Sequence, residues 1–188
     1  MGKSSSKDKL IEAMASLILE KGLANTSPRD ILERSGVGHG SLYHHFKGKE
    51  DLALHSVNHN IDTWKEKTKT LFSANQGPKE KLNTYFDSPR DVMRGCLIGQ
   101  MARDGEMMAS PELAEAITGG FSWITEKLES VLQEGIQSGD FNAWLSPSET
   151  ALLILCSVQG SYVVAKGLQD EAVMRKNINA LKKLIFSE

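Results

Sequence analysis

Apolar residues recur along this chain at the three- and four-residue spacing of α-helices. Near the N-terminus one such set falls on a single helical face, and a Gly-Leu pair after it marks a helix end, which predicts a helix over about 7–21. No segment alternates apolar and polar residues with the period of two that strands require. The pattern therefore predicts an all-α chain.

Two further helix starts share one form, a serine followed by proline and an acid. Ser27-Pro28-Arg29-Asp30 offers a capping hydroxyl, a proline at the first helical position and an acid in the first turn, and Gly36 ends the helix so begun. Ser146-Pro147-Ser148-Glu149 has the same form and predicts a helix to about Gly167.

The remaining periodic segments complete a prediction of about nine helices. Two short helices joined by the tight glycine turn at 36–38 and flanked by longer helices form a tri-helical helix-turn-helix unit. Beyond it the pattern is looser, and the helix over 111–139 is expected to break or loosen at Gly119-Gly120. The other predicted helices cover about 39–46, 49–74, 78–86, 91–105 and 170–186.

This organisation predicts a helix-turn-helix domain over 1–52 and a second domain over 53–188, with helix 49–74 joining them and 75–78 as the best linker candidate. The helix that starts at Pro147 is apolar nearly all round, so it must be buried on most sides. Either it forms an interface with a second copy of the chain, together with the last helix (about 147–186), or it is the central helix of the core.

Composition describes an ordinary globular protein, with 40% hydrophobic and 24% charged residues. Cys96 and Cys156 are too few for a disulfide framework and lack the spacing of a zinc site, which favours a reducing, cytoplasmic setting; Cys156 is expected to be structural. The apolar run at 151–156 is far shorter than a membrane span, so no membrane partner is expected.

The net charge of −2 seems at first to argue against a protein that binds nucleic acid. Residues 1–70, however, hold 11 Lys and Arg against 9 Asp and Glu, a net of +2, while residues 71–188 hold 11 against 15, a net of −4. The charge distribution is compatible with a small basic DNA-binding part on an acidic body.

The segment from Thr26 to Leu52, TSPRDILERSGVGHGSLYHHFKGKEDL, resembles the signature of the TetR family of transcriptional regulators. The resemblance covers about the first 60 residues. It implies an all-α protein with an N-terminal domain that binds double-stranded operator DNA and a divergent C-terminal domain that binds a small-molecule effector and forms a homodimer.

By this resemblance, Leu42 and Phe46 hold the recognition helix to the core, and a small-residue start lets that helix approach the DNA. Lysines after the recognition helix suit phosphate. The expected DNA-binding residues are Thr26, Ser27, Arg29, Gly38, His39, Gly40, Ser41, Tyr43, His44, Lys47 and Lys49.

Family members commonly carry a Ser-Lys pair where this chain has Gly38-His39. Histidine replaces a permanent charge with one that depends on pH, so our hypothesis is that DNA affinity falls as pH rises from about 6 to 8. His55 and His59 lie four residues apart without a third ligand, so neither a metal nor a cofactor is expected.

Large and adaptable side chains in the second half suit an apolar effector pocket. The candidates, with two amides as hydrogen-bonding groups, are Tyr85, Cys96, Gln100, Met101, Phe121, Trp123, Gln159 and Tyr162. Trp64 is a further candidate because it lies on the helix that joins the domains, which a ligand must move to affect DNA binding. The segment Arg94-Gly95-Cys96-Leu97 also resembles a TetR subgroup that includes repressors sensing electrophiles or oxidants through a cysteine. The alternative is that Cys96 is a small buried apolar residue.

The predicted function is a ligand-responsive, sequence-specific DNA-binding transcriptional regulator, a repressor released from its operator by a small molecule. One alternative is a helical dimerisation adaptor that does not bind DNA. The other is an enzyme, but the chain has no Gly-rich phosphate loop, H-E-x-x-H or G-x-S-x-G motif, so no enzymatic activity is expected.

Overall fold

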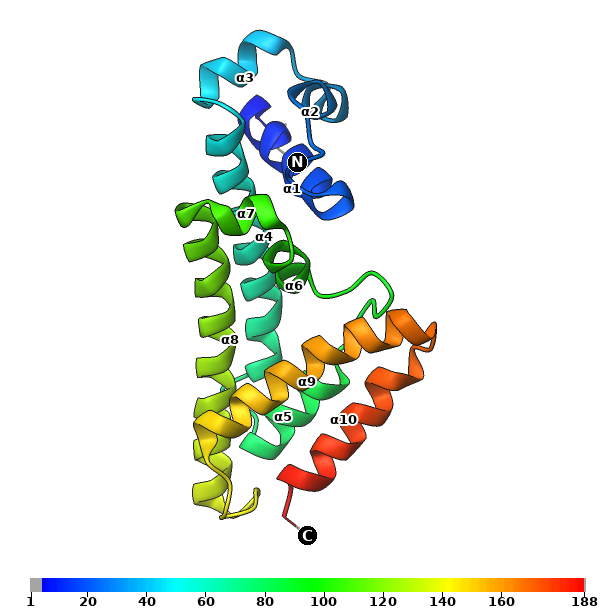
Figure 1. Ribbon diagram of the computed structural model, residues 1–188. Coiled ribbons are helices and arrows are strands. Elements are labelled where there is room, and N and C mark those ends of the chain that lie inside the picture. Colours follow the sequence, from blue (N-terminus) through cyan, green and yellow to red (C-terminus); the bar gives the residue numbers. More distant parts are fainter. Residues whose placement is uncertain (1–4, 188) are drawn as a thin grey trace. The chain divides into compact units, whose positions relative to one another are not determined.

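The computed structural model describes residues 5–187 and confirms the all-α prediction (Figure 1). Over these residues it contains ten α-helices, one 3₁₀-helix and no strand beyond a single bridge between Phe141 and Phe186. The elements are α1 (Ser6–Lys21), α2 (Pro28–Ser35), α3 (His39–His45), α4 (Lys49–Lys69), η1 (Thr70–Phe72), α5 (Pro78–Asp87), α6 (Leu97–Ala102), α7 (Gly105–Ala109), α8 (Pro111–Ser138), α9 (Pro147–Leu168) and α10 (Ala172–Ile185).

The chain forms two compact units whose borders differ from the predicted domain boundary after residue 52. The first unit contains the chain up to Lys65 together with Leu97–Gly120, and the second contains Glu66–Cys96 and the residues from Phe121 onward. Helices α4 and α8 each begin in the first unit and continue into the second. Residues 97–120, which the sequence assigns to the C-terminal domain, therefore pack with the helix-turn-helix.

In the first unit, α1 packs against α2, α3 and α6, with its apolar face fully buried. Two polar side chains of α4 also bind the backbone of α1: the Ser56 hydroxyl donates to the Ile11 carbonyl at 3.2 Å, and the Asn60 amide donates to the Ala15 carbonyl at 3.0 Å. Both side chains are buried, so these bonds fix the register of α1 on α4.

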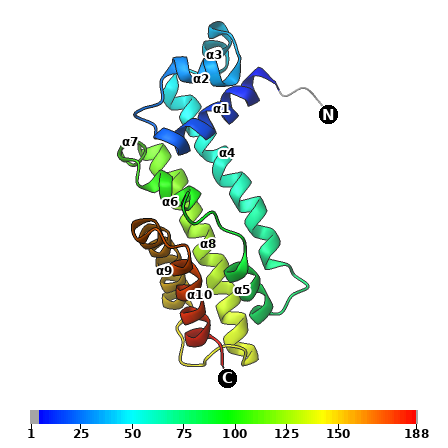
Figure 2. The same ribbon diagram turned by 90° about the vertical axis from the view of Figure 1, so that its right-hand side faces the viewer.

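In the second unit, α9 and α10 lie side by side and antiparallel, as Figures 1 and 2 show. The turn before α9 is held to the chain's end, because the Asn142 amide donates to the Leu184 carbonyl at 3.0 Å and the buried Phe141 ring stacks on Phe186. Lys182 of α10 forms an ion pair with Asp87 of α5 at 2.7 Å. Helix α5 and α10 are thereby joined at their C-terminal ends.

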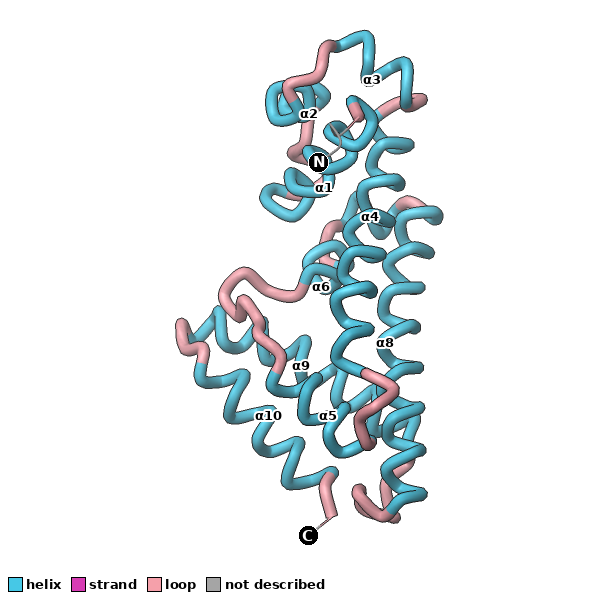
Figure 3. Tube along the Cα trace, turned by 180° about the vertical axis from the view of Figure 1, so that it is seen from behind, coloured by secondary structure: helices cyan, strands magenta, loops and turns pink. Residues whose placement is uncertain are grey.

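The prediction of one helix over 91–105 is wrong. A loop runs from α5 to α6 (Figure 3), and two short helices follow it. The Arg90 guanidinium, in this loop, donates to the carbonyls of Tyr85, Phe86 and Ser88 at 2.6, 2.8 and 2.9 Å and so closes the end of α5. Gly95 then has a φ of 97°, which is outside the helical region.

The expected break in α8 at Gly119-Gly120 is also wrong, since α8 is continuous. Gly120 serves close packing: a Cβ there would lie 2.9 Å from the Cδ1 atom of Ile98. A β-carbon at Gly119 would meet no atom within 4 Å. The glycine pair therefore admits a neighbouring side chain and does not interrupt the helix.

Helix α9 is less buried than its composition predicts. By length and composition α9 could cross a membrane, which the short apolar run at 151–156 did not indicate. Only 28% of its most apolar 18-residue stretch is buried. Cys156, expected to be structural, is exposed. The exposed residues of α9 that are apolar or small are Leu152, Leu153, Cys156, Gly160, Val163, Val164, Gly167 and Leu168, and the exposed polar ones are Ser148, Glu149 and Lys166.

Candidate nucleic-acid interface and effector residues

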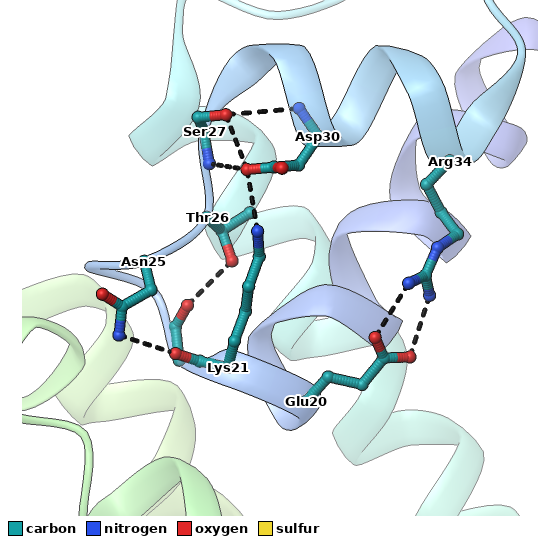
Figure 4. A network of polar contacts seen from close by, with 8 residues as sticks. Glu20, Lys21, Asn25, Thr26, Ser27, Asp30 and Arg34 are labelled. Atoms are coloured by element: carbon teal, nitrogen blue, oxygen red, sulfur yellow. Dashed lines mark hydrogen bonds and ion pairs between the residues drawn. The ribbon is translucent and has the colours of Figure 1, made fainter.

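Local hydrogen bonds define the helix-turn-helix (Figure 4). The Ser27 hydroxyl accepts from the Asp30 N–H at 3.2 Å, and the Asp30 carboxylate accepts from the Ser27 N–H at 2.8 Å, which is a complete capping box. Gly36 ends α2 in the left-handed conformation, with a φ of 65°. The predicted span of α2 is therefore confirmed at both ends.

Helix α3 places one face in the core and the opposite face on the surface. Leu42 and Phe46 are buried, as predicted, while Tyr43 is 56% exposed and His44 is also exposed. The ring of His39 lies 5.0 Å from the ring of Tyr43, so these two side chains form one aromatic edge on the outer face. Gly38 and Gly40 are exposed with no atom near their would-be Cβ positions.

Two ion pairs fasten α2 to α1 (Figure 4). Lys21 binds Asp30 at 2.8 Å, and Arg34 binds Glu20 through both guanidinium nitrogens at 2.8 Å each. Hydrogen bonding from Lys21, followed by that from Ser27, holds the pKa of Asp30 well below its usual range. Asp30 thus serves α2 both as a capping residue and as a tie to α1.

Thr26, one of the expected DNA-binding residues, is buried. Its side chain is 1% exposed, and its hydroxyl donates to the Gly22 carbonyl at 2.8 Å. A threonine at this position stabilises the turn between α1 and α2 by a local bond. The expected contact of Thr26 with phosphate or a neighbouring base stays a prediction.

The other predicted DNA-binding residues lie at the start of α2, in the turn after α3 and at the start of α4. Ser27, Arg29 and Lys47 are exposed, and the half-buried Lys49 lies 3.7 Å from Glu106, which sequence reasoning did not connect with it. Sequence reasoning also missed Ser6. Its hydroxyl lies 3.1 Å from Nε2 of His45 and so links the start of α1 to the recognition helix.

Three predicted effector residues gather around one arginine in the second unit. Tyr85 is buried, the Arg90 guanidinium lies 5.2 Å from its ring centroid, and burial raises the pKa of Tyr85. Burial also raises the pKa of Tyr162 to about 12, and the nearby Arg90 partly opposes that shift while Cys96 adds to it. Sequence reasoning missed Arg90, which no motif marks.

The remaining effector candidates are distributed over both units. Trp64, Gln100 and Met101 belong to the first unit, where Met101 is fully buried, and Phe121, Trp123 and Gln159 belong to the second, where each is half-buried. Within the second unit, Tyr85 also stacks on Phe72, with 5.6 Å between the ring centroids.

Two family models match this chain and together cover most of it. Residues 10–55 match the N-terminal model of the bacterial regulatory proteins of the tetR family, and residues 79–181 match a tetracyclin repressor-like C-terminal domain. The chain belongs to the TetR family. The first match contains α2 and α3, and the second spans α5 to most of α10.

TetR-family relatives match along nearly the whole chain. A helix-turn-helix regulator in the lacX 3′ region of Lactococcus lactis subsp. lactis is 24% identical, over 94% of this chain and 91% of its own length. The repressor DhaR of a Mycobacterium species (strain GP1) is 24% identical, over 88% and 85%. The crystal structure of reduced E. coli NemR shares the fold, with a TM-score of 0.86, 17% identity and coverage of 97% and 98%.

Membership of the family, with the exposed recognition helix, establishes the general function. This protein is a ligand-responsive, DNA-binding transcriptional regulator. TetR-family repressors bind operator DNA and small-molecule effectors and usually form dimers. The adaptor and enzyme alternatives are not favoured, because the relatives are transcriptional regulators.

Proposed function

We propose that this TetR-family protein is a cytoplasmic repressor that binds a palindromic operator as a homodimer and leaves it when an apolar small molecule binds the second unit. The observation that carries the proposal is the two-sided recognition helix, with Leu42 in the core and Tyr43 on the surface. The half-sites are expected to lie about one helical turn apart or slightly more. No enzymatic activity is proposed.

The proposed DNA contacts divide by chemistry. Residues on the outer face of α3 reach base edges or the backbone, and residues at the starts of α2 and α4 bind phosphate, since helix N-termini favour anions. The proposed set is Ser27, Arg29, Gly38, His39, Gly40, Ser41, Tyr43, His44, Lys47 and Lys49, and the buried Thr26 stays a candidate.

Selection of bound sequences from a random DNA library, followed by binding to the gene's own upstream region, tests this proposal. Lys49→Ala is expected to weaken binding evenly across sequences and to lower the slope of log affinity against log salt by about 1. An unchanged slope contradicts the phosphate role of Lys49. Failure of the unmodified chain to select any sequence contradicts the proposed operator.

For dimerisation we propose the exposed apolar face of α9, together with the exposed Leu184 of α10. An apolar face of this length on a helix otherwise packed against its own chain fits a second copy of the same surface. Its small residues, Gly160 and Gly167, permit close approach of the two copies.

A charge placed on this face tests the dimer. Leu153→Glu and Val164→Glu are expected to turn a dimer into a monomer in analytical ultracentrifugation, because each buries a carboxylate in the interface. Met108→Glu, at another exposed apolar residue, is the matched control and should leave the mass unchanged. A dimeric Val164→Glu variant contradicts the proposed interface.

For the effector we propose a site that uses the cluster around Arg90. Arg90 donates to three carbonyls and is thereby held in place, and Tyr85 and Tyr162 add phenol groups to an apolar surrounding. Such a combination suits an apolar molecule that carries a few hydrogen-bonding atoms. The other predicted effector residues stay candidates.

A thermal-shift screen of apolar compounds tests this site. Compounds that raise the melting temperature of the unmodified chain are expected to lose most of that effect in Tyr162→Phe, which keeps the ring and removes the hydroxyl. Undiminished shifts contradict the role of Tyr162.

Cysteine sensing is tested separately with N-ethylmaleimide, which alkylates thiols. If Cys96 is the sensor, alkylation releases the operator from the unmodified chain and from Cys156→Ser but leaves Cys96→Ser bound. Equal release from all three proteins contradicts sensing through Cys96.

A further inference from the structure

A half-buried carboxylate joins the entrance of the helix-turn-helix to a segment 81 residues further along the chain. The Leu23 N–H donates to Oδ2 of Asp104 at 2.7 Å, while Oδ1 of Asp104 accepts from the N–H groups of Glu106 and Met107 at 3.0 and 3.2 Å. Leu23 is buried, so its N–H has no water to replace this bond. All these residues belong to the first unit.

The surroundings of Asp104 accommodate a carboxylate closely. Gly22, the residue before Leu23, has a φ of 81°, and a Cβ there would lie 2.9 Å from Oδ2 of Asp104. A side chain at position 22 would be strained in its backbone and would displace the carboxylate. Glycine at this position therefore serves both the helix end and the approach of Asp104.

The charge and two-oxygen geometry of aspartate matter here. A capping residue for α7 needs one acceptor oxygen, which serine, threonine or asparagine also supplies. The second oxygen of Asp104 accepts from the Leu23 N–H, and an asparagine in the same place would present an amide donor either to that N–H or to the N–H groups of Glu106 and Met107. The long-range bond is therefore separable from the capping of α7 by substitution.

The same segment also contacts the other end of the helix-turn-helix. Leu23 begins the turn that enters α2, and Lys49 begins the helix that follows α3. Lys49 lies 3.7 Å from Glu106, two residues after Asp104. The Asp104–Glu106 segment thus contacts the chain before α2 and after α3, and α7 leads directly into α8.

We propose that Asp104 is a positioning residue for DNA binding, whose carboxylate fixes the chain entering the helix-turn-helix to the segment that leads into α8. The proposal rests on the proposed function, because α8 continues into the unit that carries α9 and the effector cluster. Movement of the start of α8 is then transmitted to α2 and α3 through the bond to Leu23. Loss of the bond leaves the recognition helix folded but less fixed in position.

The test compares Asp104→Asn with the control Asp91→Asn. Among the described hydrogen bonds, the Asp91 carboxylate accepts only from the N–H of Arg94, three residues further along the chain. Each protein is titrated by fluorescence anisotropy against the selected operator and against operators whose half-sites are moved by about one or two base pairs. Asp104→Asn is expected to lose affinity for the cognate operator on the order of tenfold. Its affinity for the operators with altered spacing should fall much less, so the ratio of its affinities for the two kinds of operator becomes smaller than that of the unmodified chain.

A purely structural role gives a different result. If Asp104 only supports folding, the variant lowers the active fraction and reduces affinity equally for every spacing, which overturns the proposal. Equal behaviour of Asp104→Asn, Asp91→Asn and the unmodified chain also overturns it. Should Asp104→Asn melt below the assay temperature, Asp104→Ser keeps a capping oxygen for α7 and is subject to the same two criteria.

These outcomes are distinguishable from failure of the proposed function. An unmodified chain that selects no operator contradicts the function itself. An unmodified chain that discriminates between spacings, beside a variant that discriminates equally well, contradicts only the role of Asp104.

Discussion

The helix-turn-helix and the second unit are both helical, but different interactions define their helices. Helix α2 has a complete capping box, a proline at its first position and a left-handed glycine at its end, all within ten residues. Helix α9 shares the Ser-Pro-x-acid start, yet the Ser146 side chain makes no capping hydrogen bond. The same sequence pattern therefore has different consequences in the two regions.

The difference shows where burial replaces local bonding. Helix α9 buries Ile154, Val158 and Ala165 and packs along α10, so its formation does not depend on a capped first turn. Helix α2 buries a single residue, Ile31, and depends far more on its ends. Substitutions that separate burial from capping test this comparison.

The largest effect is expected at Gly135 of α8, in the second unit. A Cβ at this position would lie 2.1 Å from two ring carbons of the buried Phe141, so Gly135→Ala should cost about 4 kcal/mol, above the ~1–3 typical of overpacking. Gly119→Ala, in the same helix with free space around it, should instead stabilise the protein by about 0.5–1 kcal/mol. Urea unfolding of both variants measures the difference, and equal effects would contradict the packing argument.

The next effect separates the two faces of the recognition helix. Leu42→Ala should cost about 3 kcal/mol, because Leu42 is 2% exposed and leaves a cavity when shortened. Tyr43→Ala should leave unfolding within about 0.5 kcal/mol of the unmodified protein, since surface substitutions rarely do more. Tyr43→Ala should instead lower the affinity for the operator, which an operator titration measures. A Tyr43→Ala variant that is less stable but binds the operator as well as the unmodified protein would contradict the placement of Tyr43 on the DNA-binding face.

A smaller effect compares the two similar helix starts directly. Ser27→Ala should cost about 1 kcal/mol, because it removes the acceptor for the Asp30 N–H, whereas Ser146→Ala should cost close to nothing. Thermal and urea unfolding of the two variants under one set of conditions gives the comparison. Similar losses at both positions would mean that Ser146 caps α9 in solution.

The smallest effect concerns acid. The pKa of Asp30 is lower in the folded protein than in the unfolded chain, because Lys21 and Ser27 stabilise its carboxylate, so folding gains stability above the unfolded pKa of 3.8. That stability is lost as pH falls from 3.8 through the lower folded pKa. Asp30→Asn and Lys21→Met should therefore both flatten the dependence of unfolding free energy on pH below about 4. Curves parallel to that of the unmodified protein would contradict the shift.

The sequence predicts most of the first unit because its signals are local. The bounds of α2 follow from Ser27, Pro28 and Gly36, and the buried and exposed positions of α3 follow from the family signature. Thr26 shows a use that the sequence did not predict: the resemblance implies a DNA contact, and in the structure its hydroxyl also donates to the Gly22 carbonyl four residues back. A residue type alone does not distinguish these two uses.

The chain beyond the helix-turn-helix was predicted less accurately, and single residues explain the errors. Arg90 closes α5 with three backbone bonds, and a loop followed by the short helix α6 stands where one helix over 91–105 was predicted. The Gly119-Gly120 pair suggested a break in α8, but Gly120 admits Ile98. Neither contact has a signature in the residues that flank it.

By itself the sequence determined the all-α class, the TetR-type helix-turn-helix and the ends of its helices, because caps, glycine turns and apolar spacing act between residues that are close along the chain. Only the tertiary structure decided which face of α9 stays open, how Arg90, Tyr85 and Tyr162 gather, and that Asp104 binds the N–H of Leu23. These features join residues tens of positions apart, and such bonds depend on how the helices pack. Spacing in the sequence carries no record of them.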